Sequence, residues 1–400
     1  MPEQGFAYLR GLPRVYWLLW TGALINRLGG FVAPFLALYL TQDRQLAVEQ
    51  AGLVVSVFGG GILLAGPVGG VLTDRLGRRH TMVLGLVLGA LAMLHLGAAR
   101  SVTHIAIAAF LLGLLGELYR PAVSAAVADL VPSQDRARAY GLLYWAINLG
   151  FAFAGALGGV ISTKGFTLLF LADAATTLLY AGVIYRYVPE TRPAPTPGAA
   201  PLHWTAPFRD STFMAFAALT LLVALIFQQH IVALPLDLRA HGISPSVYGG
   251  LISINGALIV VLQPAVGKLS LRFSRSRTLA VAALITGLGF GLTGLARTPL
   301  GYGVSVAVWT LGEIIMAGIS PSVVADLAPP ELRGGYQGLF NMTWGGAACI
   351  APLLGSFVLV RFGAGALWSS CVGVGVVSAI GHLLLAGPQA RRLAAIAQGG

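Results

Sequence analysis

Long apolar segments follow one another along almost the whole of this 400-residue chain. Hydrophobic residues make up 56% of it and charged residues only 10%, whereas soluble domains carry about 25% charged residues. Most segments reach the approximately 20 residues that a helix needs to cross a membrane, and backbone groups in lipid must bond within their own segment. The pattern therefore predicts twelve membrane helices, at about residues 15–40, 50–72, 81–98, 104–128, 139–161, 165–187, 212–236, 247–269, 278–296, 301–326, 336–359 and 364–387.

Lys and Arg are distributed unevenly over the connections between these segments. If the N-terminus is cytoplasmic, the opposite loops hold only Arg44, Arg100, Lys164, Arg239, Arg297 and Arg361. Two more arginines lie inside segments, and the rest of the 25 basic residues fall on the cytoplasmic side. The positive-inside rule then predicts a multi-pass plasma (inner) membrane protein with both termini in the cytoplasm. The scattered basic residues explain the net charge of +11 without a nucleic-acid partner.

Two motifs occur twice at nearly the same separation. GPVGGVLTDRLGRRH at 66–80 is similar to QPAVGKLSLRFSRSR at 263–277, and GELYRPAVSAAVADLVP at 116–132 to GEIIMAGISPSVVADLAP at 312–329. Such repeats predict a duplicated bundle, and six prolines within residues 189–207 indicate an extended linker. We expect an all-α membrane protein of two pseudo-symmetric six-helix bundles, residues 1–188 and 212–400, joined by a cytoplasmic Pro-rich linker at 189–211.

The connection between the second and third segments carries a specific motif. It has the form G-x-L-x-D-R-x-G-R-R and contains Gly70, Leu72, Asp74, Arg75, Gly77, Arg78 and Arg79. It resembles the signature of the major facilitator superfamily between helices 2 and 3, and the twelve-helix layout extends the resemblance over the whole chain. Within that family the chain is most similar to the 12-helix bacterial drug/proton antiporters. Of their helix 5 signature, G-P-x-x-G-G, it keeps Gly158 and Gly159.

The resemblance implies a cytoplasmic gate formed by this motif. Gly70 and Gly77 suit a short, sharply turned loop. Arg78 is expected to join Asp74 to Asp129 at the cytoplasmic end of helix 4, in a charge cluster that closes one side during alternating access. The alternative is a purely topological role for the basic residues. In the second copy Leu271 replaces Asp74, so that loop is expected to be structural.

Several ionisable residues lie within the apolar segments, where each costs about 2.5–3.5 kcal/mol at mid-depth. We expect Glu313, Glu117, Arg120, Arg27 and Asp173 to take part in proton coupling. Glu313 is the favoured proton site because no arginine lies near it on its own helix, whereas Arg120 or Arg27 can pair with Glu117. Structural ion pairs are the alternative, and whether Arg27 binds substrate or a glutamate stays open.

Polar and aromatic residues on the remaining helices predict a cavity for an amphipathic organic solute. Packing or interfacial anchoring is the alternative for each aromatic residue. The predicted cavity residues are Asn26, Tyr144, Trp145, Asn148, Gln228, Gln229, His230, Asn255, Gln263, Asn341 and Trp344.

These features predict a secondary active transporter, most simply a monomer, for proton-coupled efflux of drug-like or amphipathic organic compounds. The alternative is a proton-coupled symporter or exchanger of a sugar, peptide or organic anion, because arginines beside glutamates suit a charged solute. A non-transporting receptor or an enzyme is the remote alternative, since the chain has no zinc-protease, nucleophile-elbow or phosphate-loop motif. We expect neither a metal nor a cofactor, because Cys349 and Cys371 lie singly in apolar segments.

Overall fold

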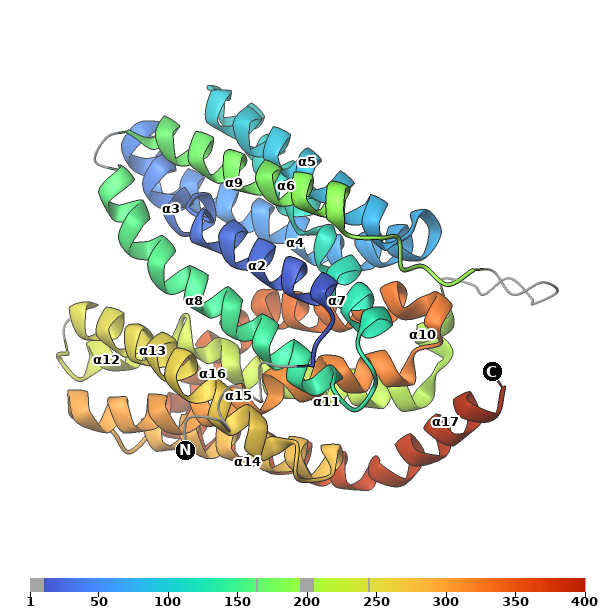
Figure 1. Ribbon diagram of the computed structural model, residues 1–400. Helices are drawn as coiled ribbons and strands as arrows, with labels where there is room; N and C mark the ends of the chain where they lie inside the picture. Colours follow the sequence, from blue (N-terminus) through green and yellow to red (C-terminus); the bar gives the residue numbers. More distant parts are fainter. Residues whose placement is uncertain (1–10, 163–164, 195–204, 244, 400) are drawn as a thin grey trace. The chain divides into compact units, whose positions relative to one another are not determined.

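The computed structural model describes residues 11–162, 165–194, 205–243 and 245–399 (Figure 1). Arg10, Lys164 and residues 195–204 of the predicted linker lie outside them. The described chain is helical and contains no strand. Its helices are α2 (Arg14–Leu28), α3 (Val32–Leu38), α4 (Val48–Leu76), α5 (Arg78–Ala98), α6 (Val102–Glu117), α7 (Tyr119–Leu130), α8 (Arg136–Ser162), α9 (Phe166–Tyr187), α10 (Ala206–Arg209), α11 (Ser211–Phe227), α12 (Ala233–Ala240), α13 (Pro245–Ser270), α14 (Arg275–Thr293), α15 (Pro299–Leu327), α16 (Arg333–Leu384) and α17 (Ala386–Gly399).

Each of the twelve predicted segments coincides with helix. The first and the seventh are interrupted, since Gly29–Phe31 separate α2 from α3 and a 3-10 turn, Gln228–His230, follows α11. Segments eleven and twelve are two helices that meet at Gly363, where the backbone is not helical (φ 84°), and they share the label α16. Nine helical stretches of the described chain are long and apolar enough to cross a membrane. The predicted all-α membrane fold is therefore confirmed.

The chain forms two compact units. Unit 1 contains Met1–Asp135, Ala146–Trp204 and Ala328–Met342, and unit 2 contains Arg136–Trp145, Thr205–Leu327 and Thr343–Gly400. The first turns of α16 thus belong to unit 1, although most of α16 belongs to unit 2, and the first turns of α8 belong to unit 2. The division into bundles 1–188 and 212–400 stays a prediction.

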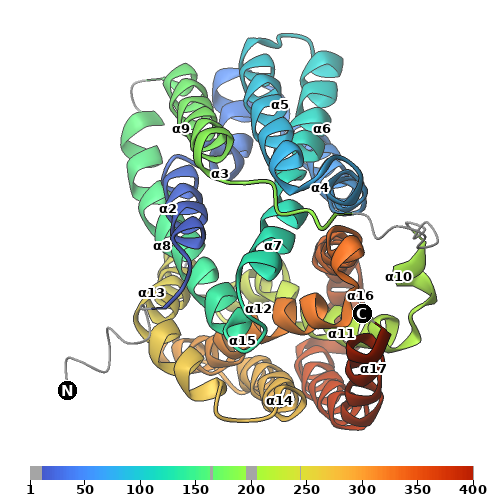
Figure 2. The same ribbon diagram turned by 45° about the vertical axis from the view of Figure 1, so that its right-hand side comes forward.

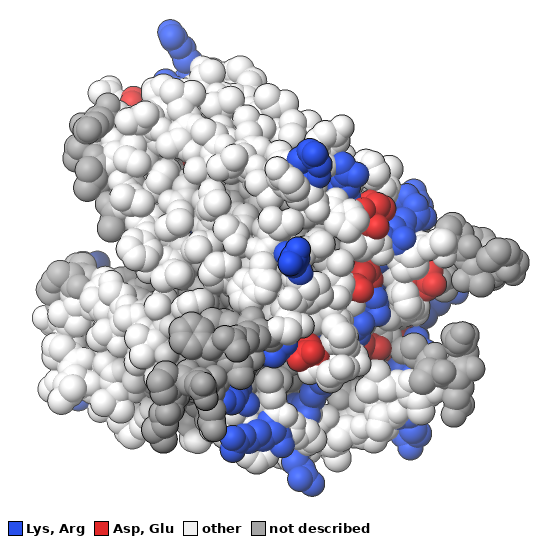
Figure 3. All heavy atoms as spheres, in the orientation of Figure 1, with Lys and Arg blue, Asp and Glu red and all other residues white. Residues whose placement is uncertain are grey.

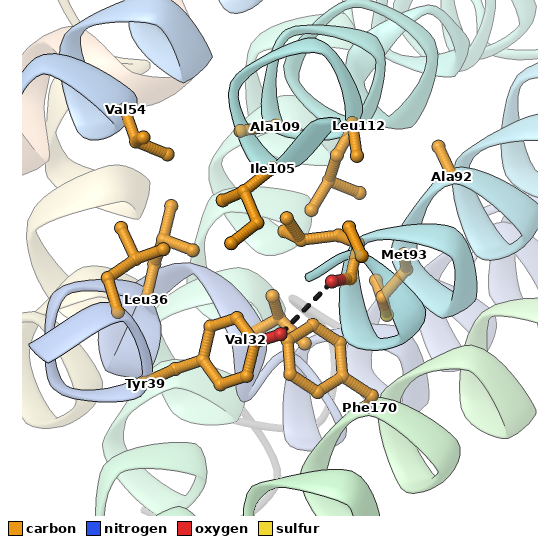
Figure 4. Packing of buried hydrophobic residues seen from close by; sticks show 14 of the residues in the cluster. Val32, Leu36, Tyr39, Val54, Ala92, Met93, Ile105, Ala109, Leu112 and Phe170 are labelled. Atoms are coloured by element: carbon orange, nitrogen blue, oxygen red, sulfur yellow. Dashed lines mark hydrogen bonds between the residues drawn. The ribbon is translucent and has the colours of Figure 1, made fainter. Parts of the chain in front are cut away.

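Unit 1 is built on close packing between α4, α5, α6 and α9. In Figures 1 and 2 α5 lies beside both α6 and α9, and α4 packs along α6. Figure 4 shows a buried apolar cluster of this unit, to which Tyr39, Ile105 and Phe170 belong. The Tyr39 hydroxyl donates to the carbonyl of Leu96 at 3.0 Å, which satisfies a polar group inside that cluster.

Unit 2 has α15 at its centre, packed against α13 and α14. Its core contains stacked aromatic rings, with the centroids of Phe290 and Trp309 5.2 Å apart. Large apolar side chains also face outward, including Leu353, Val360 and Leu300. In Figure 3 much of the visible surface is uncharged, and most of the Lys, Arg, Asp and Glu residues gather toward the right and the lower edge of the view. An exterior of this kind suits contact with lipid rather than water.

Candidate functional site

Three of the charged residues predicted within apolar segments lie together in unit 1. An Nη2 atom of Arg27, on α2, lies 3.9 Å from a carboxylate oxygen of Glu117 at the end of α6. Arg120 contacts the same carboxylate through its Nε and donates from Nη2 at 3.2 Å. Arg27 and Glu117 are mostly buried, whereas the Arg120 side chain is 46% exposed. Glu117 therefore has two arginine partners, one mostly buried and one about half exposed.

Hydrogen bonds connect this ion pair to α7 and α9. Arg27 donates to the Tyr119 hydroxyl at 3.2 Å, which in turn donates to the side-chain oxygen of Asn26 at 3.4 Å. The amide of Asn26 donates to Thr177 at 2.9 Å. Because each of these side chains needs its neighbour as a partner, a change at Arg27 would extend to the start of α7 and the middle of α9.

Asp173, on α9, lies next to the interruption between α2 and α3. Its Oδ2 accepts a hydrogen bond from the Val32 backbone N–H at 2.9 Å, and the side chain is only 4% exposed. The carboxylate thus occupies the N-terminal end of α3, where backbone donors have no partner within the helix. The structure gives Asp173 a position that holds the two pieces of the first membrane segment in place.

A cavity of about 90 Å³ adjoins these groups and is lined by both polar and apolar side chains of unit 1. Arg27, Glu117 and Asp173 contribute charge, and Phe58 and Phe151 contribute apolar surface. Arg27 lies 5.2 Å from the centroid of the Phe151 ring, and its buried Nε has no hydrogen-bond partner among the described residues. A volume of this size holds several waters, so the cavity can bring protons or a small polar group to these charges.

Glu313, on α15 of unit 2, has different neighbours. One carboxylate oxygen accepts a hydrogen bond from the Tyr144 hydroxyl and the other from the Asn255 amide at 2.8 Å. Asn255 also donates to Thr310 at 3.0 Å. In the described part of the chain, Glu313 forms no salt bridge with Lys, Arg or His within 4.0 Å. Its charge would therefore be stabilised by neutral donors alone.

Aromatic rings surround His230, beside the interruption that follows α11. The His230 ring stacks on Trp309 with centroids 5.9 Å apart, and its Nδ1 lies 2.7 Å from the carbonyl of Phe227. Phe227 in turn packs edge-on against Trp344 at 5.8 Å. His230 and Trp344, two of the predicted cavity residues, thus share one aromatic cluster, in which the histidine is held by packing.

The other predicted cavity residues are dispersed. Trp145 donates to the carbonyl of Val260, and Gln229 to the carbonyls of Leu225 and Ala351, so these side chains bond to backbone. Gln263 is buried, and neither of its amide atoms has a partner within the described residues. Gln228, in unit 2, and Asn148 and Asn341, in unit 1, are partly buried.

The G-x-L-x-D-R-x-G-R-R motif at the end of α4 forms a dense charge cluster in unit 1. The Arg78 side chain is fully buried, with Nη1 3.5 Å from Asp74 and Nε donating to Asp129 at 2.9 Å. Arg333, at the first position of α16, also pairs with Asp129. Removing one member of a buried pair leaves an uncompensated charge, so this cluster holds its helix ends together strongly.

Asp74 also occupies the N-terminus of α16. Its two carboxylate oxygens accept the backbone N–H groups of Gly334 at 2.9 Å and Gly335 at 2.7 Å. These donors lack partners within their own helix, and the helix dipole favours a negative charge there. Gly70 permits the approach, because a Cβ atom at this position would lie 2.6 Å from the carbonyl oxygen of Gly334.

Glu190, which follows α9, stabilises the N-terminus of α5 in a similar way. Gly77 turns the chain with a φ of 99°, and Glu190 accepts the N–H groups of Arg78 at 2.8 Å and Arg79 at 3.1 Å. Burial raises the pKa of Glu190, but N–H groups led by that of Arg192 more than offset this effect and hold its pKa below the ordinary value. The Arg192 side chain completes the turn by donating to the carbonyl of Arg75.

Unit 2 contains a counterpart of the Asp129 cluster that the motif analysis missed. Asp326, at the end of α15, pairs with both Arg136 and Arg275. In the repeat, Asp326 corresponds to Asp129, Arg136 to Arg333 and Arg275 to Arg78. The signal was available in the sequence, since applying the repeat offset to Arg78 leads to Arg275. The second loop therefore keeps an ion pair, although Leu271 replaces Asp74.

Interrupted apolar helices, an uncharged exterior and buried charges are the features of a multi-pass membrane transporter. The model of the Major Facilitator Superfamily matches residues 19–352 and 216–398. The chain therefore belongs to the Major Facilitator Superfamily.

Individual proteins are similar over most of the chain. An uncharacterized MFS-type transporter of Bacillus subtilis, YttB, is 26% identical over 362 residues, covering 89% of this chain and 91% of the relative. A Na(+), Li(+), K(+)/H(+) antiporter of Planococcus maritimus is 25% identical over 359 residues, covering 80% and 84%. The crystal structure of the human organic anion transporter MFSD10 has a TM-score of 0.77 at 19% identity, covering 92% of this chain and 99% of that one, and shows the shared fold.

Proposed function

We propose that this transporter exports amphipathic organic compounds in exchange for protons. It would act as a monomer in the plasma membrane, with both termini in the cytoplasm as the distribution of Lys and Arg predicts. The observation that carries the proposal is the environment of Glu313, a carboxylate on a membrane helix whose described hydrogen-bond partners are the neutral side chains of Tyr144 and Asn255.

Proton exchange at Glu313 follows from this environment. A carboxylate without a cationic partner in an apolar surrounding gains a proton easily when its donors move away. Tyr144 and Asn255 lie on α8 and α13, so a displacement of either helix relative to α15 would alter the proton affinity of Glu313. Proton uptake and release can then accompany the change of access from one membrane side to the other.

The remaining features fit an organic substrate and a conformational cycle. The partly buried rings of Phe227, His230 and Trp344, packed around the buried Trp309, offer flat apolar surface for an amphipathic solute. Two hydrogen bonds connect Asp74 to the N-terminus of α16, although the two segments are far apart in the sequence. Such bonds can form in one conformational state and break in another. The relative named as an antiporter with protons supports exchange rather than symport.

Purified protein in lipid vesicles tests this proposal. An acidic vesicle lumen should drive ethidium, an amphipathic cation, into the lumen, because antiport moves substrate against the proton flux in either protein orientation. Accumulation with an acidic bath instead would identify symport and contradict the proposal. Protein-free vesicles measure the passive distribution of the dye.

A second candidate is exchange or symport of an organic anion or another polar metabolite. Arg27 favours it, because the buried Nε has no described partner and the guanidinium lines a cavity. The fold relative named as an organic anion transporter agrees with this chemistry. The same vesicles, assayed with radiolabelled carboxylates and with Na⁺ or K⁺ gradients, separate an anion or inorganic-cation substrate from the amphipathic dye.

A further inference from the structure

Two histidines meet where α5 is followed by α6, in a part of unit 1 that the proposed transport mechanism does not use. The Nε2 atoms of His95 and His104 lie 3.0 Å apart, and the ring centroids are 4.7 Å apart. Both side chains are exposed. Two imidazole nitrogens that converge at the surface can share a proton or bind one metal ion, since neutral imidazole is a common metal ligand.

The backbone beneath both histidines is firmly held. Leu96 and Ile105, the residues that follow them, are fully buried in the apolar cluster of Figure 4, where Ile105 is labelled. The His95 carbonyl accepts the N–H of Ala99 at 3.0 Å, and the His104 N–H donates to the Ser101 hydroxyl at 3.3 Å. Only side-chain torsions therefore need to adjust when an ion binds, which lowers the entropic cost of binding.

The spacing of the nitrogens suits a first-row transition metal. With metal–nitrogen bonds of about 2.0–2.1 Å, a separation of 3.0 Å corresponds to an angle of roughly 91–97° at the metal. This is near the angle between adjacent ligands in octahedral or square-planar coordination, which Ni²⁺ and Cu²⁺ accept. Tetrahedral Zn²⁺ needs a few tenths of an ångström more, within the reach of the side-chain torsions.

We propose that His95 and His104 form a binding site for a divalent late transition-metal ion, with waters at the remaining coordination positions. Among the described residues no group of three or more His, Cys, Asp or Glu side chains is placed to hold a metal. The ion is therefore bound by two protein ligands only, and it exchanges readily. When bound, it joins the end of α5 to the first turn of α6.

The chemistry of the site is set by its two imidazoles. Arg44, which follows the π-helical turn Tyr39–Asp43, donates from its guanidinium to the Tyr39 hydroxyl and to the carbonyl of Gly97, two residues after His95. Asp43 lies 3.7 Å from the same guanidinium. A hard cation such as Mg²⁺ would find no oxygen ligands on the two rings, so selectivity for nitrogen-preferring ions follows from the ligands themselves.

Isothermal titration of Ni²⁺ and Zn²⁺ into the full-length protein, purified without a histidine tag, tests the site. We expect one ion bound per chain at pH 7.5, at least tenfold weaker binding in both His95→Asn and His104→Asn, and weaker binding in acid as protons compete for the rings. Thr103→Ala, at an exposed position beside His104, is the matched control, because it keeps both imidazoles and the Ser101 cap and should bind the ions as the parent does. Mg²⁺ should not bind.

Electron paramagnetic resonance of bound Cu²⁺ gives a second measurement. The parent should show two coordinating imidazole nitrogens, and each asparagine variant one. Unchanged affinity and an unchanged spectrum in both variants would overturn the proposal. Size-exclusion elution at the parent volume verifies that the variants are folded. Transport is not part of the readout, so this result is independent of the proposed exchange of protons for organic compounds.

Discussion

Glu117 and Glu313 occupy corresponding positions of the repeat but have opposite electrostatic environments. Glu117 lies beside Arg27 and Arg120, whereas the described partners of Glu313 are the neutral Tyr144 and Asn255. An arginine stabilises the ionised carboxylate, and its absence leaves protonation possible. Duplication therefore preserved the acid while changing its neighbours, and this difference leads us to propose separate roles for the two glutamates.

The segment that ends α4 in unit 1 and its counterpart at the end of α13 in unit 2 also differ. Asp129 and Asp326 each pair with two arginines. In unit 1, however, Asp74 also accepts two N–H groups at the start of α16, and its counterpart in unit 2 is Leu271. A charge at a helix terminus depends on that terminus staying in place, so the first loop is the one suited to a conformational switch.

The largest effect is expected at the glutamates. Glu313→Gln should reduce proton-driven accumulation of ethidium in vesicles with an acidic lumen to the level of protein-free vesicles, because a neutral amide cannot exchange a proton. Glu117→Gln is the matched variant. Because Arg27 and Arg120 hold the Glu117 carboxylate, this variant should retain proton coupling. It should lower ethidium accumulation less than Glu313→Gln does, through loss of the ion pair. Full coupling in Glu313→Gln would refute the assignment.

The second-largest effect is expected where α4 and α16 come into close contact inside unit 1. A Cβ atom at Gly338 would lie 2.3 Å from the carbonyl oxygen of Gly66, and neither backbone can yield easily. Gly338→Ala should therefore cost about 1–3 kcal/mol and slow turnover at least several-fold. Gly346→Ala, on the same helix with open space around its Cβ position, should keep parental turnover. Equal rates for the two variants would show that this contact does not form during transport.

A smaller effect is expected at the helix terminus. Asp74→Asn removes the charge at the start of α16 and the ion pair with Arg78, an effect of about 1 kcal/mol that should slow turnover about fivefold. Leu271→Asn makes the comparable change in the second loop and should alter turnover little. If both variants slow transport equally, the functional distinction between the two loops is wrong.

The smallest effect concerns stability and its dependence on pH. The folded-state pKa of Glu190 is lowered, so its stabilising contribution is present above the unfolded pKa of about 4.3 and is lost as pH falls through the folded value. Glu190→Gln should lower the free energy of unfolding by about 1 kcal/mol at pH 7, and the difference from the parent should vanish in acid. Thermal unfolding in detergent from pH 7 to pH 3 measures this, and a difference that stays constant over the range would contradict it.

Parts of the candidate site could be predicted because their signals are local. Arg27, Glu117 and Glu313 stand out as charges within apolar segments, and the cost of burying charge makes each one conspicuous. The partners of Glu313 could not be predicted, since Tyr144 and Asn255 come from two other helices. The role of Glu190 was missed for a similar reason, because a glutamate beside a proline-rich linker has no distinctive pattern in the sequence.

The sequence by itself determined the membrane class, the positions of the helices, the internal repeat and the family motif. These depend on hydrophobicity, segment length and short-range chemistry, which are properties of neighbouring residues. Only the tertiary structure decided that the first turns of α16 belong with unit 1, that Asp173 holds the start of α3, and that His95 meets His104. Each of these contacts joins elements whose mutual approach is set by the packing of whole helices, which no local pattern encodes.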